Sequence, residues 1–150
     1  MRHTTLLTLI ALTAACGSKP APPPPPPVKA ATPVPTPAPP AVGTVTLGSA
    51  IGDDKTVTAP GDVFGNKDTI YASVATTGAG PVKLRAVWTF VKGDKTAKVH
   101  DSTIEFDSTG PATNEFHVGN PKGWPRGDYR VEIFLGDSTT PATTNTFKIQ

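Results

Sequence analysis

The fold class follows from the stretch Gly127-Asp128-Tyr129-Arg130-Val131-Glu132-Ile133-Phe134-Leu135. From Tyr129 to Leu135 every second residue is apolar, and the charged residues Arg130 and Glu132 separate the first three of them. This period of two is typical of a β-strand with one face in a core and the other face in water. The stretch therefore predicts a strand that is buried on one side.

Further alternating runs surround this stretch, and clusters of Gly, Pro, Asn and Asp separate them. They predict strands at 45–51, 70–74, 84–90, 96–106, 116–118 and 147–149, with turns at 92–95 and 136–141. The apolar pattern changes phase between Val99 and Ile104, which predicts a bulge or a break near Asp101-Ser102. No run has a helical period. About seven strands in roughly 105 residues predict an all-β fold, an antiparallel β-sandwich.

Two features of these strands resemble immunoglobulin-type sandwiches. Trp88 lies on the third predicted strand, where such sandwiches bury a tryptophan. The stretch Trp124-Pro125-Arg126-Gly127-Asp128-Tyr129-Arg130-Val131 is similar to the W-P-x-G-x-Y-x-V pattern of small extracytoplasmic immunoglobulin-like domains. The resemblance implies an immunoglobulin-like sandwich with Trp88 and Tyr129 in its core, Tyr129 forming a tyrosine corner. The paired cysteines of antibody domains are missing, so a fibronectin-III-like variant fits equally well.

Composition divides the chain into three parts. Residues 1–15 combine Arg2 with a short apolar run, too short for the ~20 residues that span a bilayer, and predict a cleaved export signal. Residues 16–42 hold twelve of the 18 prolines and predict a linker. Residues 43–150 form the sandwich domain and carry 11 Lys and Arg against 12 Asp and Glu. This balance lacks the basic surface that nucleic-acid binding needs.

Cys16 is the only cysteine, and it directly follows Leu12-Thr13-Ala14-Ala15. The segment resembles the lipobox of bacterial lipoproteins, with Thr13 at a place that is usually Leu. The resemblance implies that Cys16 receives a diacylglyceryl group, that the signal is cut before it, and that its new amino group is acylated. Two or three acyl chains anchor a protein stably to a membrane. By the same resemblance, Gly17 favours the outer membrane, facing the periplasm. The alternative is an ordinary secretory signal that contains a cysteine.

The Pro-rich part predicts an extended segment. Proline fixes its own φ and restricts the residue before it, so Pro22 to Pro27 favour polyproline II. At ~3.1 Å per residue, roughly 26 residues would extend about 80 Å. We interpret the segment as a semi-rigid stalk that holds the domain off the bilayer. Its P-x-x-P spacing also fits a docking motif for a proline-binding domain.

No catalytic or metal-binding set stands out in the sequence. His100 and His117 fall on different predicted strands, and a metal site needs three or four converging ligands, so we expect no metal and no cofactor. Gly136-Asp137-Ser138 is similar to the start of some esterases, but no His follows it, and it predicts a turn. Asp53-Asp54 and Asn66-Lys67-Asp68 lack the spacing of a calcium loop and also predict turns.

Trp124 has two interpretations. It lies in the turn-rich stretch 119–126, where it either caps the open end of the core or forms an exposed aromatic anchor beside Lys122 and Arg126. Exposed aromatic and arginine side chains of this kind are enriched at binding hot spots. A second candidate surface is the terminal strand at 145–150, which we expect to be a free edge open to strand addition.

These observations leave three functions open. The first is a lipid-anchored, non-catalytic binding or accessory module whose partner is an envelope protein or a cell-wall component. The second is a structural spacer of the envelope without a specific ligand. The third is an envelope hydrolase, which the missing nucleophile, base and orienting group disfavour. We predict the first, in a protein that is not an enzyme.

Overall fold

The computed structural model describes residues 38–150, which belong to one compact unit spanning Pro35–Gln150. The lipidation site predicted at Cys16, the signal and most of the Pro-rich part lie outside the described residues. The regular elements of the described part are the strands β1 (Ala41–Gly48), β2 (Val63–Phe64), β3 (Ile70–Thr77), β4 (Ala79–Lys92), β5 (Lys95–Thr109), β6 (Ala112–Val118), β7 (Gly127–Leu135) and β8 (Thr143–Ile149). Regular structure thus begins at Ala41, two residues before the expected domain boundary.

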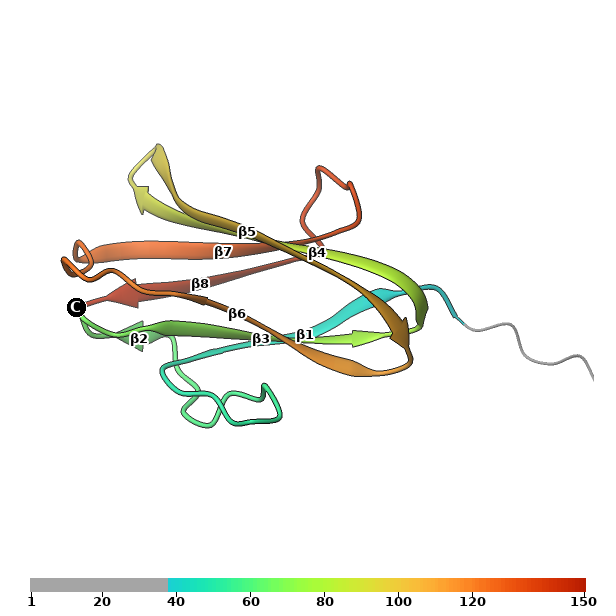
Figure 1. The fold of residues 1–150 in the computed structure, drawn as a ribbon. Helices are drawn as coiled ribbons and strands as arrows, with labels where there is room; N and C mark the ends of the chain where they lie inside the picture. Colours follow the sequence, from blue (N-terminus) through green and yellow to red (C-terminus); the bar gives the residue numbers. More distant parts are fainter. Residues whose placement is uncertain (1–37) are drawn as a thin grey trace, which may run out of the picture. The chain divides into compact units, whose positions relative to one another are not determined.

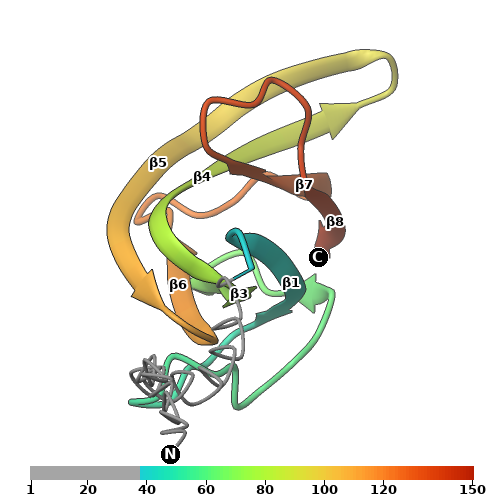
Figure 2. The ribbon, with the colours of Figure 1, turned by 90° about the vertical axis from the view of Figure 1, so that its right-hand side faces the viewer.

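The strands form two sheets that lie one above the other (Figure 1). One sheet has the order β1-β3-β6, and the other has the order β2-β8-β7-β4-β5. Neighbouring strands are antiparallel, except that β2 runs parallel to β8. Figure 2 shows how β5 curves around one side of the molecule from the larger sheet toward β6. The predicted all-β antiparallel sandwich is confirmed.

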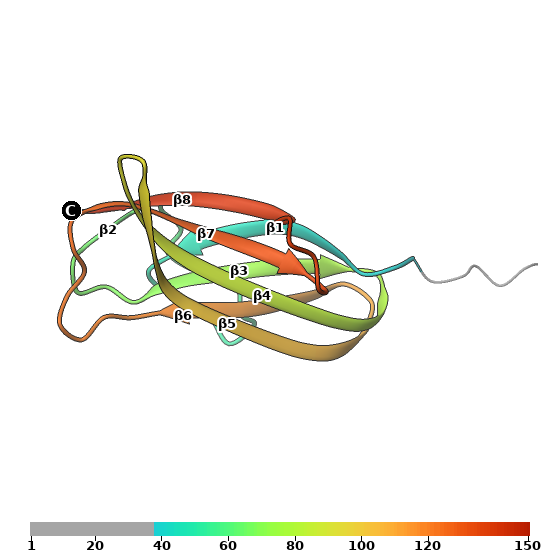
Figure 3. The ribbon, with the colours of Figure 1, turned by 90° about the horizontal axis from the view of Figure 1, so that it is seen from above.

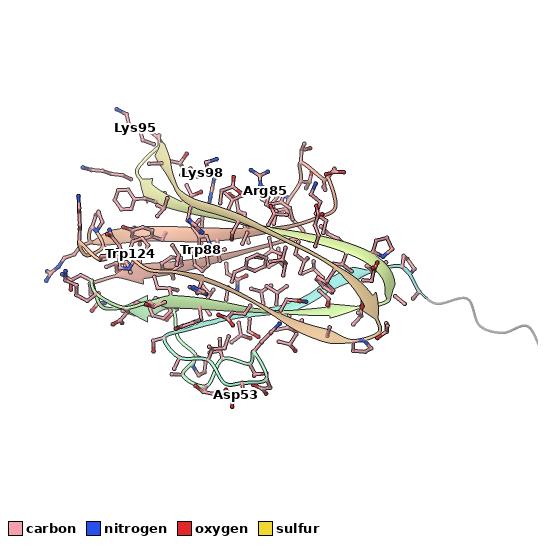
Figure 4. The ribbon with its side chains drawn as sticks, viewed as in Figure 1. Asp53, Arg85, Trp88, Lys95, Lys98 and Trp124 are labelled. Atoms are coloured by element: carbon pink, nitrogen blue, oxygen red, sulfur yellow. The ribbon has the colours of Figure 1, made fainter. Side chains whose placement is uncertain are left out.

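The core lies between the two sheets and is made by alternate residues of each strand. On β7, Tyr129, Val131 and Ile133 are at most 2% exposed, as their alternation predicts. Trp88 is 1% exposed and lies between the layers (Figure 4). Each large apolar side chain buried in this way contributes about 1.5–3 kcal/mol relative to exposure. The expectation that Trp88 and Tyr129 belong to the core is therefore confirmed.

Tyr129 forms the predicted tyrosine corner. Its hydroxyl donates a hydrogen bond to the carbonyl oxygen of Pro125, at 2.8 Å. Its ring stacks on Phe147 with centroids 5.3 Å apart, and Phe147 in turn meets Trp88 edge-on at 5.9 Å. Aromatic contacts therefore run without a break from the middle of the core to the start of β7.

Two details of the first strands differ from the prediction. β1 ends at Gly48, and Ile51 lies beyond it, in an isolated bridge with Val57. Val57 and Ala59 pack directly against Gly48, where a Cβ would lie 2.3 Å from the Val57 side chain, so only glycine fits at the end of β1. The second detail is β2, two residues long, which no alternating pattern of the sequence indicates.

The bulge and the free edge also differ from the prediction. Trp88 pairs with His100 and Thr89 with Lys98, so the extra residue in β5 is Val99 rather than one near Asp101-Ser102. The apolar pattern misplaces the bulge because the even-numbered residues of β5 beyond the bulge, which lie on one face of the strand, include polar residues where β5 forms the edge of the larger sheet. The end of β8 is not a free edge, because Lys148 and Ile149 pair with β2.

Candidate functional site

An apolar hollow of about 280 Å³ opens at one end of the sandwich. It is lined by Phe90, Ala97, Val99, Asn120, Trp124, Pro125 and Tyr129. The β4–β5 hairpin lies at the left of Figure 1 and Trp124 at the left of Figure 4, whereas the described chain enters β1 from the right. The hollow therefore lies at the end of the module opposite the entry of the chain.

The hollow exists because the two sheets differ in size. The larger sheet has five strands and the smaller has three, and β5 is an edge strand of the larger one. Viewed from above, the tip of the β4–β5 hairpin projects beyond the neighbouring strands (Figure 3). Phe90 and Ala97 are paired residues on the inner face of this hairpin, and Val99 in the bulge is 39% exposed. The inner face of the hairpin is thus left uncovered by the smaller sheet.

Trp124 supports the hollow from the side of the core. Its side chain is 5% exposed, and its indole N–H donates to the carbonyl oxygen of Asp68 at 2.9 Å. The indole also packs edge-on against Tyr129, with ring centroids 5.8 Å apart. The exposed-anchor interpretation of Trp124 is therefore wrong: the indole caps the core and offers only its margin to the hollow, because its polar N–H is satisfied inside.

The loop that carries Trp124 is held by its own backbone and by one amide side chain. Asn120 donates from its side chain to the carbonyl oxygen of Gly123 at 2.7 Å and accepts from the N–H of Lys122 at 3.1 Å. Gly127, where the loop meets β7, has φ +146°, and a Cβ there would lie 2.8 Å from the Phe90 ring. Glycine at this position lets the loop approach the hairpin and close one side of the hollow.

Basic residues lie on the two segments that line the hollow, the loop and the β4–β5 hairpin. Lys122 and Arg126 are exposed on the loop, as the sequence indicates, and the hairpin adds exposed Lys92 and Lys95. We call these four residues the basic rim. Asp94 is the acidic residue of the hairpin turn between them. Within residues 38–150, none of the four belongs to an ion pair.

The outer face of the larger sheet is different, because its charges are paired. Arg85 donates two hydrogen bonds to Asp101, at 2.8 and 2.6 Å, and Lys98 donates a third at 3.1 Å. These donors hold the pKa of the Asp101 carboxyl well below its usual range, the bond from Arg85 contributing most. Lys83 lies 2.7 Å from Asp137, which lowers the pKa of that carboxyl. This face offers a partner little net charge.

The remaining candidates from the sequence do not form a catalytic set. His100 lies on β5 and His117 on β6, in different sheets, and His117 contacts Glu115 at 3.0 Å. The hydroxyl of Ser138 donates to the carbonyl oxygen of Thr140 within a turn. No three His, Cys, Asp or Glu side chains converge in the part of the chain that the structure describes. Between residues 38 and 150, no helix has the length and apolar character needed to cross a membrane.

Both acidic stretches considered for calcium form surface turns. Asp54 accepts a hydrogen bond from the backbone N–H of Thr56 at 3.0 Å, in the loop below the smaller sheet where Figure 4 labels Asp53. Asp68 accepts from the backbone N–H of Gly65 at 2.7 Å. Each carboxylate therefore stabilises its own turn.

Sequence reasoning identified one side of the hollow and missed the other. The loop pattern indicates Trp124, Lys122 and Arg126, and the structure brings Trp124 into one lining with residues of the hairpin. Nothing in the sequence marks Ala97, and Val99 stands out only where the apolar pattern changes phase. The change of apolar phase after Val99 is the signal that marks this part of β5 as unusual.

No model of a protein family matches the sequence, and no curated protein matches it. The structure is similar to that of an immunoglobulin-like protein from Pseudomonas aeruginosa, with a TM-score of 0.50 and 14% identity, covering 75% of this chain and 98% of that one. It is also similar to part of a β-glucosidase from Erythrobacter marinus, with a TM-score of 0.51 and 11% identity, covering 74% of this chain and 15% of that one. These similarities show the fold, an immunoglobulin-like β-sandwich, while the glucosidase activity belongs to the whole of that other protein.

Proposed function

We propose that this chain is a lipid-anchored protein of the bacterial cell envelope whose immunoglobulin-like domain binds a partner without catalysis. The lipid is attached at Cys16, and the acyl chains hold the protein in the outer membrane, facing the periplasm. The Pro-rich segment serves as the stalk. The partner is an envelope protein or a cell-wall component.

The observation that carries this proposal is the position of the hollow. The described chain enters the sandwich at Ala38, and the hollow lies at the opposite end (Figure 4). A module that is tethered through its N-terminal side presents its opposite end most freely. The hollow has an apolar lining, and the two segments beside it carry basic residues that form no ion pair within residues 38–150, a combination suited to contact with another molecule.

Site-directed photo-cross-linking in intact cells tests this function. A benzophenone amino acid replaces Val99 in one variant of the full chain and Val63 in another. Val63 is the matched control for Val99. Both are exposed strand residues, with exposed fractions of 50% for Val63 and 39% for Val99, and only Val99 lines the hollow. We expect a discrete cross-linked product from position 99 and none of that mass from position 63.

The outcome separates the binding module from a spacer. A product that forms from position 99 and disappears when Lys122→Glu is added supports binding at the hollow. Equal products from both positions, or no product from position 99 in chains that are exported and folded, would overturn the proposed function in favour of a structural spacer.

A further inference from the structure

We infer that the hollow and the basic rim together recognise an acidic segment of a protein partner, with one apolar side chain of that segment seated in the hollow. This inference rests on the proposed function and specifies the chemistry of the partner. Three observations favour such a partner: the size of the hollow, the distribution of charge, and the absence of ion pairs at the basic rim within residues 38–150.

The hollow is about as large as the smallest pockets that bind small molecules, and it can hold a single apolar side chain. Pockets for small molecules are typically ~300–1,000 Å³ and enclose most of the ligand. This hollow has about 280 Å³ and is bounded on its sides by Phe90, Val99 and Trp124. The polar groups in its lining, the amide of Asn120, the indole N–H of Trp124 and the hydroxyl of Tyr129, are already bonded to backbone carbonyls. It therefore suits one leucine- or phenylalanine-sized group.

The distribution of charge favours an acidic partner. The hairpin turn and the loop carry four exposed basic residues against Asp94, whereas the rest of residues 43–150 holds seven basic and eleven acidic residues. The hairpin turn and the loop thus carry an excess of positive charge in a domain that is otherwise acidic, and the exposed carboxylate beside them on β7 is Asp128, which pairs with Val91. Such an excess attracts negative partners and repels positive ones over about a Debye length.

The basic rim is also free to pair with a partner. Five basic residues elsewhere in the domain form ion pairs with carboxylates: Lys83, Arg85, Lys98, Arg130 and Lys148. The four residues of the rim form none within the described part of the chain. A carboxylate that approaches the hollow would meet cations that need not give up an existing partner.

Selection from a random-peptide library tests the inference. The full chain, held in detergent micelles, is exposed to the library, and recovered peptides are sequenced. We expect peptides in which Asp and Glu flank a large apolar residue. For one such peptide, we expect binding to weaken about tenfold with Lys122→Glu and to fall further as salt rises from about 0.1 M to 1 M. Val99→Asp should abolish binding, because it places a carboxylate in the hollow.

The control is Lys55→Glu, which reverses an exposed charge on the loop beyond β1 and should leave peptide binding unchanged. Recovered peptides without an acidic bias would overturn the inference, as would peptides whose binding ignores both Lys122→Glu and Val99→Asp. Acidic peptides that bind equally well when their apolar residue is replaced by Ser would show recognition of charge alone, and would also overturn it. If cross-linking from position 99 succeeds while these peptide results are negative, only the inference about the partner fails.

Discussion

Tyr129 and Trp124 hold the end of the sandwich through side-chain hydrogen bonds to backbone carbonyls. Tyr129 reaches back to Pro125, four residues earlier, and Trp124 reaches across to Asp68, before β3. Each bond fixes a buried ring in a single orientation, because the alternative leaves a polar group unsatisfied in the core. The two residues therefore position the loop that forms one side of the hollow.

Removal of one hydroxyl tests the tyrosine corner. Tyr129→Phe keeps the stacked ring and loses the bond to Pro125, so we expect the free energy of unfolding to fall by about 1 kcal/mol. Urea titration followed by tryptophan fluorescence measures the change. Tyr71→Phe is the control, since Tyr71 is a half-buried tyrosine on β3 whose ring contacts His117, and we expect little change there. Equal losses in the two variants would contradict a special role for the corner.

Truncation of Trp124 separates a core cap from an exposed anchor. Trp124→Ala removes a nearly buried indole, so we expect the free energy of unfolding to fall by about 3–5 kcal/mol. Trp124→Phe keeps much of the packing and loses the bond to Asp68, and should cost less than Trp124→Ala. Denaturant titrations of both variants supply the values. A Trp124→Ala protein as stable as the parent would restore the interpretation of an exposed anchor.

At the scale of elements, the entry of the chain is fixed against the start of β4. The N–H of Ala79 donates to the carbonyl oxygen of Ala38 at 3.0 Å. Gly78 has φ +84°, and a Cβ on it would lie 2.2 Å from the carbonyl oxygen of Pro39. The backbone of Ala38–Pro39 thus occupies the space that any side chain at position 78 would need. This contact sets the direction in which the chain joins β1.

Two glycines allow a matched test of this contact. Gly78→Ala and Gly80→Ala both place a side chain at a positive φ, but only the first also meets the backbone of Pro39. We expect Gly78→Ala to destabilise more than Gly80→Ala, whose cost is about 1–3 kcal/mol of backbone strain. Hydrogen exchange should show that the amide of Ala79 loses protection in the Gly78 variant. Protection that persists would mean that Ala38–Pro39 does not pack as described.

The cluster around Asp101 links stability to pH. Because Arg85 and Lys98 lower the pKa of the Asp101 carboxyl in the folded protein, the unfolded chain takes up the proton first as pH falls. The stabilisation is therefore present above the ordinary pKa of about 4 and is lost progressively below it. Asp101→Asn should lower the free energy of unfolding at neutral pH. The gap, which is the difference in this free energy between the parent and the variant, should shrink as pH drops toward 2. Urea titrations across this range measure the gap, and a gap that stays constant would contradict the mechanism.

The alternating pattern is clearest in strands whose neighbours bury one face along their whole length. Tyr129 to Leu135 meet this condition, so their alternation is strict. β5 does not, because it lies at the edge of the larger sheet and only part of its inner face is covered. The residues of β5 on its inner face include His100 and Ser102. Because these two residues are polar, the sequence pattern indicates neither the bulge at Val99 nor the hollow. β2 was missed because two residues are too few for any period.

At the scale of the whole molecule, the described domain contains no disulfide bond, because Cys16 is the only cysteine and lies outside it. The domain is close to neutral, yet four of its basic residues that form no ion pair within residues 38–150 lie on the hairpin turn and the loop, at the end opposite the entry of the chain. A lipid anchor and a proline-rich stalk on the N-terminal side would direct that end away from the membrane. The lipid anchor is therefore the premise on which the function of the hollow depends.

The most direct measurement is the mass of the mature protein, extracted from membranes and compared with a Cys16→Ser variant. The account predicts a chain that begins at Cys16 and carries two or three acyl groups, together with loss of acylation and of membrane retention in the variant. An unacylated chain that leaves the membrane with the soluble proteins would contradict the anchor, and would point to partners that the domain meets while diffusing freely.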